Sequence, residues 1–305
     1  MRLLNVKTLK LEPPTDRPKY PYAILSHTWE NEEVLFHHIE NLDRAALEKL
    51  QGWPKVKASC AQAEKDGYQY IWNDTCCIDK SSSAELSEAI NSMWRFYRES
   101  DVCYGFLADV KKDDPETIRK SRWFKRGWTL QELIAPDRLR FFDANWIEMD
   151  DRVKMTPLLS EITGIDPAVL SRNHGSGHTH EIQPRTLLCV VCGNPTSIEE
   201  ILRRTSVAAR MSWCAARETT RDEDRAYSLL GLFGANMPLL YGEGGDAAWV
   251  RLLEEIIKKT NDQSILAFDS RPRREERAPQ SLSTAPSPFR SGIFSEHASS
   301  GMIST

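Results

Sequence analysis

The chain has 305 residues, of which 40% are hydrophobic and 28% are charged, and its formal net charge is −4. These values are typical of a globular protein and exclude an intrinsically disordered chain. Lys and Arg are interleaved with Asp and Glu, so no nucleic-acid partner is expected, and no apolar stretch approaches the roughly 18 residues that a membrane span needs.

The cysteines also bear on the cellular compartment. Their number is seven, and they are spread through the predicted strands and helices, which indicates reduced thiols rather than a disulfide framework. The apolar run at the start of the sequence is too short for a secretory signal. We therefore expect a cytoplasmic protein.

Four short apolar runs that end in polar or acidic residues are predicted strands. A fifth, short strand is expected over residues 2–6, and the four main runs span residues 22–25, 70–72, 102–107 and 139–142. The polar side chains at the ends of these four runs are Ser26, His27, Asp74, Asp109 and Asp143. Ligands of open α/β sheets bind outside the carboxyl ends of the strands, so we expect these side chains to gather along one edge.

Helices are predicted between the runs. Pro54 in a first turn and Gly67 at the end delimit one helix, and Ser82 and Glu85 have the spacing of a capping box that begins another. The apolar face of this second helix consists of Leu86, Ala89, Ile90, Met93, Trp94 and Tyr97. A Trp-rich helix is predicted over residues 121–135. The alternation of strands and helices predicts a parallel sheet covered on both faces.

The composition changes near residue 150: from there to about residue 194 the sequence is mixed, and Gly, His and Ser are concentrated between residues 173 and 180. We predict an α/β domain over residues 1–150, a mostly helical extension over 151–268 with a variable insertion near 172–196, and a disordered tail over 269–305. Within the extension, helices are expected over residues 197–213 and 247–259.

Several sequence blocks resemble a known family. YAILSHTW at residues 22–29, YIWNDTCCID at 70–79 and SRWFKRGWTLQEL at 121–133 resemble the three motif blocks of the HET (heterokaryon incompatibility) domain of filamentous fungi. Residues 210–213 and 220–244 resemble the segment that commonly follows it. The resemblance implies a role in non-self recognition and in programmed cell death after unlike hyphae fuse.

HET domains are in turn similar to TIR domains, which implies a TIR- or flavodoxin-like parallel sheet. On this comparison residues 24–27 correspond to the first strand and its exit, and residues 128–133 to the Trp-Cys-x-x-Glu-Leu helix of NAD-cleaving TIR enzymes. The spacing from Trp128 to Glu132 is kept, with threonine in place of the cysteine. The resemblance therefore implies Glu132 as the catalytic residue and a pocket that includes residues 27–30.

This comparison has a chemical consequence. Nicotinamide is a good leaving group from NAD⁺, so one fixed carboxylate at Glu132 is enough to stabilise an oxocarbenium-like transition state and orient the ribose. Trp29 or Trp128 can stack on a base. The other predicted binding residues are Ser26, His27 and Asp74. NAD⁺ is then a substrate, and neither cofactor nor metal is expected. The resemblance also implies homo-oligomerisation on activation and an upstream sensor or incompatible-allele protein as partner.

Other interpretations of these residues stay open. Glu132 can be a structural helix residue paired with Arg126, and His27 a structural hydrogen-bonding residue. Asp74 and Asp79 can serve turns and helix caps. The chain would then be a non-enzymatic signalling module that acts through homotypic contacts.

Two further sites are open alternatives, both for a hydrolase. Cys76 or Cys77 could form a thiol site with His27 and Asp79. Zinc-compatible ligands are His174, His178, His180, Cys189 and Cys192. Arg221 and Asp224 are expected to begin a capped helix or to brace the extension against the first domain.

Overall fold

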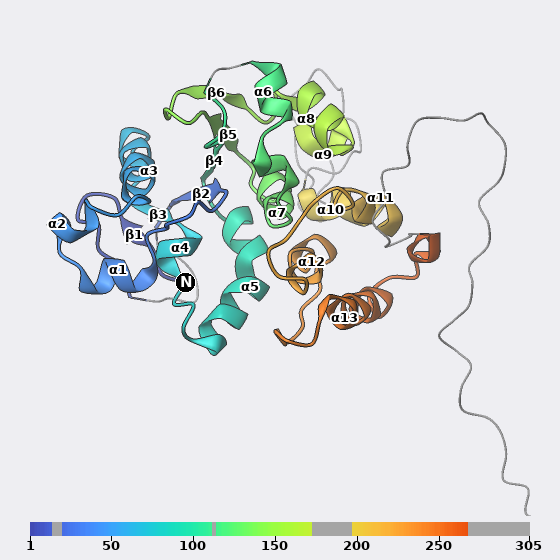
Figure 1. Ribbon diagram of the computed structural model, residues 1–305. Helices are drawn as coiled ribbons and strands as arrows, with labels where there is room; N and C mark the ends of the chain where they lie inside the picture. The colour runs from blue at the N-terminus through green and yellow to red at the C-terminus, as the bar shows by residue number, and fades with distance from the viewer. Residues whose placement is uncertain (14–19, 112–113, 173–196, 268–305) are drawn as a thin grey trace, which may run out of the picture. The chain divides into compact units, whose positions relative to one another are not determined.

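A six-stranded sheet forms the centre of the computed structural model, which describes residues 1–13, 20–111, 114–172 and 197–267. The strand order is β1-β3-β2-β4-β5-β6 (Figure 1). The strands are β1 (Leu4–Asn5), β2 (Ala23–His27), β3 (Tyr70–Trp72), β4 (Val102–Phe106), β5 (Leu139–Phe142) and β6 (Glu148–Asp151). β2 to β5 pair in parallel, and the edge strands β1 and β6 pair antiparallel. The predicted α/β sheet is confirmed, whereas β6 was not expected.

The order of the four parallel strands determines where a ligand can bind. Across the sheet these strands follow one another as β3, β2, β4 and β5. Numbered by their order in the chain, this is 2-1-3-4, the strand order of flavodoxin-like doubly wound proteins. The direction of winding reverses between β2 and β4, whose carboxyl ends are His27 and Phe106. Every residue of these two strands is buried, as a sheet covered on both faces requires.

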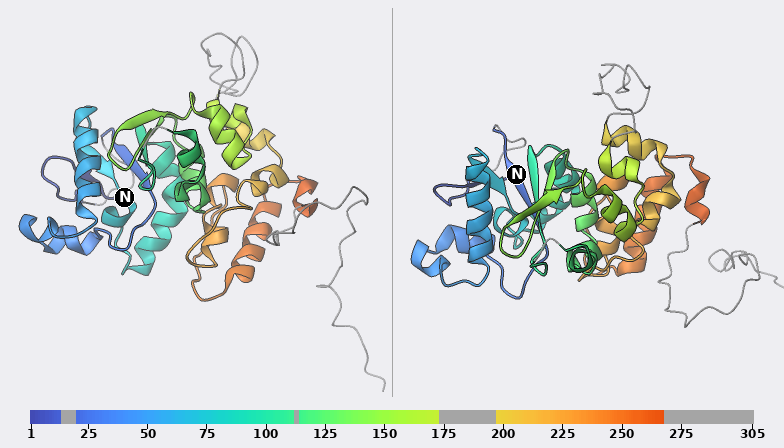
Figure 2. Two further views of the ribbon diagram at one scale, coloured as in Figure 1. Left: turned by 45° about the horizontal axis from the view of Figure 1, so that its top comes forward. Right: turned by 90° about the horizontal axis from the view of Figure 1, so that it is seen from above.

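Helices cover both faces of the sheet because right-handed crossovers in opposite directions lie on opposite faces. In Figures 1 and 2, α3 lies on one face and α5 with α7 on the other. The helices of this part are α1 (Phe36–Asn41), α2 (Arg44–Leu47), α3 (Trp53–Lys65), α4 (Asp74–Cys77), α5 (Ser83–Arg98), α6 (Pro115–Arg119), the 3-10 helix η1 (Arg122–Lys125) and α7 (Thr129–Ile134). The core includes the fully buried side chains of Trp72, Tyr97, Trp123 and Phe141.

The start of α5 agrees with the prediction in one half of its capping box. The hydroxyl of Ser82 accepts a hydrogen bond from the backbone N–H of Glu85 at 3.3 Å. The Glu85 carboxylate accepts one from the N–H of Asp79 at 2.9 Å rather than from that of Ser82. α3 begins and ends as expected, with Pro54 in its first turn and Gly67 at a φ of 88° after its last.

The predicted Trp-rich helix is broken into two pieces, η1 and α7. Between them, Arg126 pairs with Glu218 in a parallel β-bridge. The N–H of Gly127 donates to the Glu218 carbonyl at 2.7 Å, and the N–H of Glu218 donates to the Lys125 carbonyl at 2.6 Å. A Cβ atom on Gly127 would lie 2.5 Å from Cγ2 of Thr219, so the approach of the two segments requires glycine.

The region after β6 is mostly helical, as predicted. Its helices are α8 (Thr156–Thr163), α9 (Pro167–Ser171), α10 (Ile198–Arg204), α11 (Val207–Ser212), α12 (Asp224–Tyr227), η2 (Gly231–Phe233), α13 (Gly245–Ile257) and η3 (Gln263–Ala267). Arg217 connects this region to α7 by donating to the Arg126 carbonyl at 2.9 Å and to Oγ1 of Thr129 at 3.0 Å.

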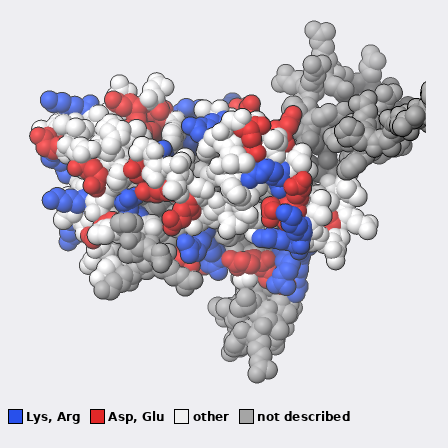
Figure 3. All heavy atoms as spheres, turned by 90° about the horizontal axis from the view of Figure 1, so that it is seen from below, with Lys and Arg blue, Asp and Glu red and all other residues white. Residues whose placement is uncertain are grey.

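Residues 1–270 form one compact unit, and the boundary near residue 150 stays a prediction. The predicted tail and nearly all of the predicted insertion lie outside the described residues. None of the described helices has the length and apolarity to cross a membrane. Acidic and basic side chains are mixed over the face seen from below (Figure 3).

The close approach at Gly127 gives a stability prediction. We expect Gly127→Ala to lower the free energy of unfolding by about 1–3 kcal/mol, because its methyl group would collide with that of Thr219. Thr219→Ser removes the colliding methyl and keeps the hydroxyl that donates to the Arg221 carbonyl. In urea unfolding the double variant should recover most of the loss, and equal losses with and without Thr219→Ser would contradict this explanation.

Candidate functional site

A cavity of about 390 Å³ lies at the carboxyl ends of β2 and β3. Its size is at the lower end of the range for small-molecule sites. The first part of the chain lines it with His27, Trp29, Asp74, Lys80, Tyr97, Arg126, Trp128 and Glu132, among others. The C-terminal region adds Thr220, Arg221, Asp224 and Tyr241. Five of the six predicted site residues therefore line one cavity, and the sixth, Ser26, contacts it through Glu132.

Glu132 lies on α7 with only 6% of its surface exposed. Its Oε2 accepts a hydrogen bond from the Ser26 hydroxyl at 2.5 Å, and that hydroxyl accepts one from Nε1 of Trp123 at 2.9 Å. Among the described residues Glu132 forms no ion pair, so the interpretation in which Arg126 pairs with it does not describe this geometry. The carboxyl group is buried and faces the cavity, and the hydrogen bond from Ser26 fixes its orientation.

The environment of Glu132 favours its neutral form. Burial raises the pKa of Glu132 to about 7, and the nearby negative charge of Asp74 adds to this rise. The hydrogen bond from Ser26 and the charge of Arg126 oppose it but do not outweigh the burial. A carboxyl with such a pKa changes its charge near neutral pH, as many catalytic carboxyls do.

The environment of Asp74, in contrast to that of Glu132, favours the ionised form of the carboxyl. Its Oδ1 is 2.9 Å from Nε2 of His27, and its Oδ2 accepts from Nε1 of Trp29 at 3.0 Å and lies 3.5 Å from Nζ of Lys80. Burial opposes the ionisation of Asp74, but Lys80, His27 and Arg126 together hold the pKa of its carboxyl far below the usual range. Asp74 is therefore ionised throughout the physiological range.

His27 is a neutral group in this arrangement. Burial and the positive charge of Lys55 lower the pKa of His27, although Asp74 opposes this. Its Nε2–H points at Asp74, and its buried Nδ1 has no hydrogen-bond partner among the described residues. Ser26 and His27 are consecutive in β2, and their side chains point to opposite faces, one toward Glu132 and one toward Asp74.

Aromatic rings and cations form the outer wall of the cavity. Nζ of Lys80 lies 3.6 Å from the centre of the Trp29 ring, and the Arg126 guanidinium lies 5.5 Å from it. The Arg221 guanidinium lies 4.3 Å from the centre of the Tyr241 ring. The arrangement can bind a flat group against its rings and an anion against its cations.

Arg221 and Asp224 take part in this wall. The Asp224 Oδ1 accepts a hydrogen bond from the Tyr241 hydroxyl at 2.8 Å. Burial raises the pKa of Asp224, although hydrogen bonds from Tyr241 and Trp128 oppose the rise. Of these contacts, only the hydrogen bond from Trp128 to Asp224 joins the C-terminal region to the first part of the chain, so the bracing role of the pair stays a prediction.

Two acidic residues predicted at the same edge have other partners. Oδ1 of Asp109 accepts from the Ser121 hydroxyl at 2.7 Å, and its Oδ2 accepts from the N–H of Arg122 at 2.8 Å. Asp143 accepts from the N–H groups of Asn145 and Ile147 in the turn before β6. Both carboxylates fix loops, and neither lines the cavity.

The thiol alternative finds little support in the geometry. Cys76 and Cys77 are buried, and burial raises the pKa of both thiols, that of Cys77 to about 12. His27 contacts Asp74 rather than a thiol, and Asp79 accepts from the Ser81 hydroxyl.

The zinc alternative concerns only residues outside the described part of the chain. The predicted ligands His174, His178, His180, Cys189 and Cys192 lie outside the described residues. Within the described ranges no group of three His, Cys, Asp or Glu side chains is arranged to hold a metal ion.

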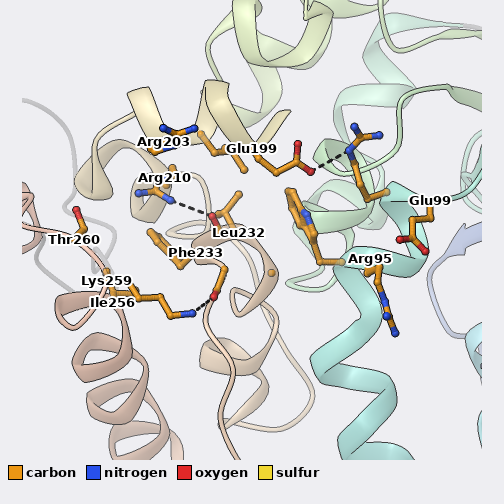
Figure 4. A pocket seen from close by; sticks show the side chains of 15 residues that line it. Arg95, Glu99, Glu199, Arg203, Arg210, Leu232, Phe233, Ile256, Lys259 and Thr260 are labelled. Carbon is orange, nitrogen blue, oxygen red and sulfur yellow. Dashed lines mark hydrogen bonds and ion pairs between the residues drawn. The ribbon is translucent and has the colours of Figure 1, made fainter. Parts of the chain in front are cut away.

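A larger cavity, of about 540 Å³, lies among α5, α10, α11, η2 and α13 (Figure 4). Its cations serve the fold: Arg210 donates to the Leu232 carbonyl at 3.1 Å, and Lys259 donates to the Gly234 carbonyl. Arg98 pairs with Glu199. Its lining contains no buried carboxyl comparable to Glu132.

Sequence reasoning missed four residues of the site, and each lacks a local signal. Tyr97 was assigned to an apolar helix face, although its hydroxyl donates to the Leu25 carbonyl at 3.0 Å beside the cavity. Lys80, Thr220 and Tyr241 were assigned no role. Only the block resemblance around residues 70–79 and 220–244 draws attention to their neighbourhoods.

Comparison with known proteins gives two matches. The family described as heterokaryon incompatibility protein (HET) matches residues 22–117. The vegetative incompatibility protein HET-E-1 of Podospora anserina is 41% identical over 273 residues, which is 85% of this chain and 18% of that protein. The chain thus spans less than a fifth of the length of this curated relative. No solved structure matches the chain significantly.

The raised pKa of Glu132 predicts a pH-dependent stability. Because the folded-state pKa lies above that of an exposed glutamate, the protonated carboxyl stabilises the fold below about pH 4.5, and this contribution is lost as the pH rises through about 7. We expect Glu132→Gln to match the parent near pH 4.5 and to be more stable by about 3 kcal/mol at pH 9 in urea unfolding.

Glu148→Gln is the matched control for this prediction. The hydrogen bond from Arg140 lowers the pKa of Glu148, so this variant should be less stable than the parent at neutral pH and equal to it in acid. A difference between Glu132→Gln and the parent that does not change with pH would contradict the assigned ionisation of Glu132.

Proposed function

Because this chain is a HET domain protein and a homologue of the Podospora protein HET-E-1, we propose that it acts in vegetative incompatibility, as an effector of programmed cell death. The proposed activity is the hydrolysis of NAD⁺ to nicotinamide and ADP-ribose. In this proposal copies of the chain self-associate on activation by an upstream sensor or an incompatible-allele protein.

The observation that carries the enzymatic proposal is the carboxyl of Glu132 facing the cavity beside the exit of β2. In the proposed reaction the nicotinamide–ribose bond breaks, and its electron pair leaves with the nicotinamide. Water then adds to C1 of the ribose and releases a proton. The Glu132 carboxylate would lie beside the positive charge that develops on the sugar and stabilise it electrostatically.

The surrounding residues support this role by fixing geometry. Ser26 donates a hydrogen bond to the Glu132 carboxyl, and Trp123 donates one to Ser26. The carboxyl is therefore fixed in place and needs little reorganisation during the reaction. The ionised Asp74 accepts a hydrogen bond from the indole N–H of Trp29 and so fixes the orientation of this ring at the cavity wall. The similarity of residues 128–133 to the glutamate helix of TIR enzymes favours the same assignment.

Glu132→Gln tests the assignment directly. We expect nicotinamide release from NAD⁺ by the concentrated or artificially oligomerised protein to fall at least about a hundredfold, because the amide carries no negative charge. Glu116→Gln, which changes an exposed glutamate on α6 that pairs with Arg119, should leave the rate unchanged.

The contrary results distinguish the alternatives. Full turnover by a folded Glu132→Gln protein would remove Glu132 from the mechanism. Killing of cells that overexpress Glu132→Gln as efficiently as the parent would favour a homotypic signalling module. Loss of turnover with a chelator, together with normal turnover by Glu132→Gln, would favour zinc.

The pKa of Glu132 also predicts the pH profile of the reaction. Only the ionised carboxylate stabilises a cationic sugar, so kcat/KM for NAD⁺ should rise between pH 6 and 8 with a midpoint near the pKa of about 7. Circular dichroism across this range controls for unfolding. A kcat/KM that stays constant over the range would show that ionisation of Glu132 does not control the reaction.

A further inference from the structure

Within the described part of the chain, two arginines at the cavity have no hydrogen-bond partner for their guanidinium N–H groups. Arg126 follows η1 and is half-buried, whereas Arg221 precedes α12 and is exposed. Both line the cavity that Glu132 faces. Among the described residues, neither guanidinium donates a hydrogen bond or lies within 4 Å of a carboxylate.

The two arginines reach the same cavity because their segments are paired. The backbone of Arg126 bridges to that of Glu218, and the chain reaches Arg221 three residues later. One cation thus comes from each side of the contact between the first part of the chain and the C-terminal region.

Each guanidinium lies over an aromatic ring. Arg126 lies over the ring of Trp29, at 5.5 Å from its centre, and Arg221 over that of Tyr241, at 4.3 Å. Stacking on a ring uses the face of the guanidinium and leaves its N–H edges free. These edges match the oxygens of a phosphate group, to which arginine donates two parallel hydrogen bonds.

Neighbouring cations are used differently. Arg122, one turn before Arg126, pairs with Glu30 at 2.8 Å and with Asp109 at 3.5 Å. Lys80, within the cavity, pairs with Asp74. The lack of carboxylate partners is therefore specific to Arg126 and Arg221 among the cations that line this cavity.

We propose that Arg126 and Arg221 bind the diphosphate of the substrate, so that the site selects diphosphate-bridged dinucleotides over uncharged nucleosides. This inference rests on the proposed function for the position of the sugar at Glu132. Glu132 is 6% exposed and lies at the floor of the cavity, whereas the exposed Arg221 lies at its mouth. A ligand with its reactive ribose at the floor therefore places its phosphates at the arginines.

Binding of ADP-ribose, measured by isothermal titration calorimetry, tests the inference without any turnover. We expect Arg126→Gln and Arg221→Gln each to weaken ADP-ribose binding at least about tenfold, since each removes charge-assisted hydrogen bonds. Adenosine, which lacks phosphate, should bind the parent and both variants equally. Arg122→Gln is the matched control and should bind ADP-ribose like the parent.

Inorganic pyrophosphate separates the diphosphate from the rest of the ligand. It should compete with ADP-ribose on the parent and lose this effect in the double variant. Arg126→Lys and Arg221→Lys keep the charge without the paired N–H geometry, and they provide folded alternatives if a glutamine variant does not fold.

The outcomes separate this inference from the proposed hydrolysis. Failure of ADP-ribose to bind the parent, or binding that neither arginine variant weakens, overturns the diphosphate site. Arginine-dependent binding of ADP-ribose by a protein that never cleaves NAD⁺ would support the diphosphate site and refute the hydrolysis. The Glu132→Gln protein should bind ADP-ribose with the same dependence on both arginines.

Discussion

The hydrogen bond between Ser26 and Glu132 is the contact on which the arrangement of the site depends. A buried carboxyl without a partner would destabilise the fold by a few kcal/mol, so α7 must lie where Ser26 can reach it. Ser26 is in the middle of the parallel sheet and is also bound by Trp123 of η1. The sheet, η1 and α7 are thus positioned by one buried hydroxyl. The same burial that requires this bond also shifts the ionisation of Glu132 into the neutral range.

The C-terminal region is part of the site rather than an appendage to it. The family match ends at residue 117, before Glu132, and the relative HET-E-1 aligns with 85% of the chain. The structure gives a physical reason why the similarity extends beyond residue 117 into the C-terminal region. The Gly127 segment pairs with Glu218, and Arg217 donates hydrogen bonds to the Arg126 carbonyl and to Thr129 at the start of α7. A helix of six residues such as α7 has little stability of its own, so these contacts fix the position of its carboxyl. Residues 220–241 then form the outer wall of the cavity.

Apolar runs, helix caps and apolar helix faces in the sequence predicted most of the strands and helices in which they lie. The apolar runs became β2 to β5, and the Ser82 cap and the apolar face of α5 are where the spacing places them. The break between η1 and α7 could not be predicted, because its cause is Glu218, far along the chain. The rule that polar residues gather at strand ends placed Asp74 and Asp109 at the same edge but says nothing of their partners. Asp74 faces the cavity, whereas Asp109 is occupied by the Ser121 loop. The place of Glu132 came from its family resemblance, since an amphipathic helix does not by itself show which carboxyl faces a cavity.

The charge of the side chains that line the cavity changes from its buried to its exposed part. Two of its carboxyls have pKa values shifted in opposite directions, because Asp74 lies among Lys80, His27 and Arg126, whereas burial dominates at Glu132. Asp74 is therefore a constant charge that organises the wall, and Glu132 is the carboxyl whose charge can change. The two cations without a carboxylate partner among the described residues, Arg126 and Arg221, are more exposed than Glu132. A dinucleotide with a cationic base on its ribose and a diphosphate bridge has the complementary pattern, positive at one end and negative at the next group. Reversing such a ligand would bring its phosphates against a buried carboxyl and leave the arginines unpaired, so electrostatics alone favours one direction of binding.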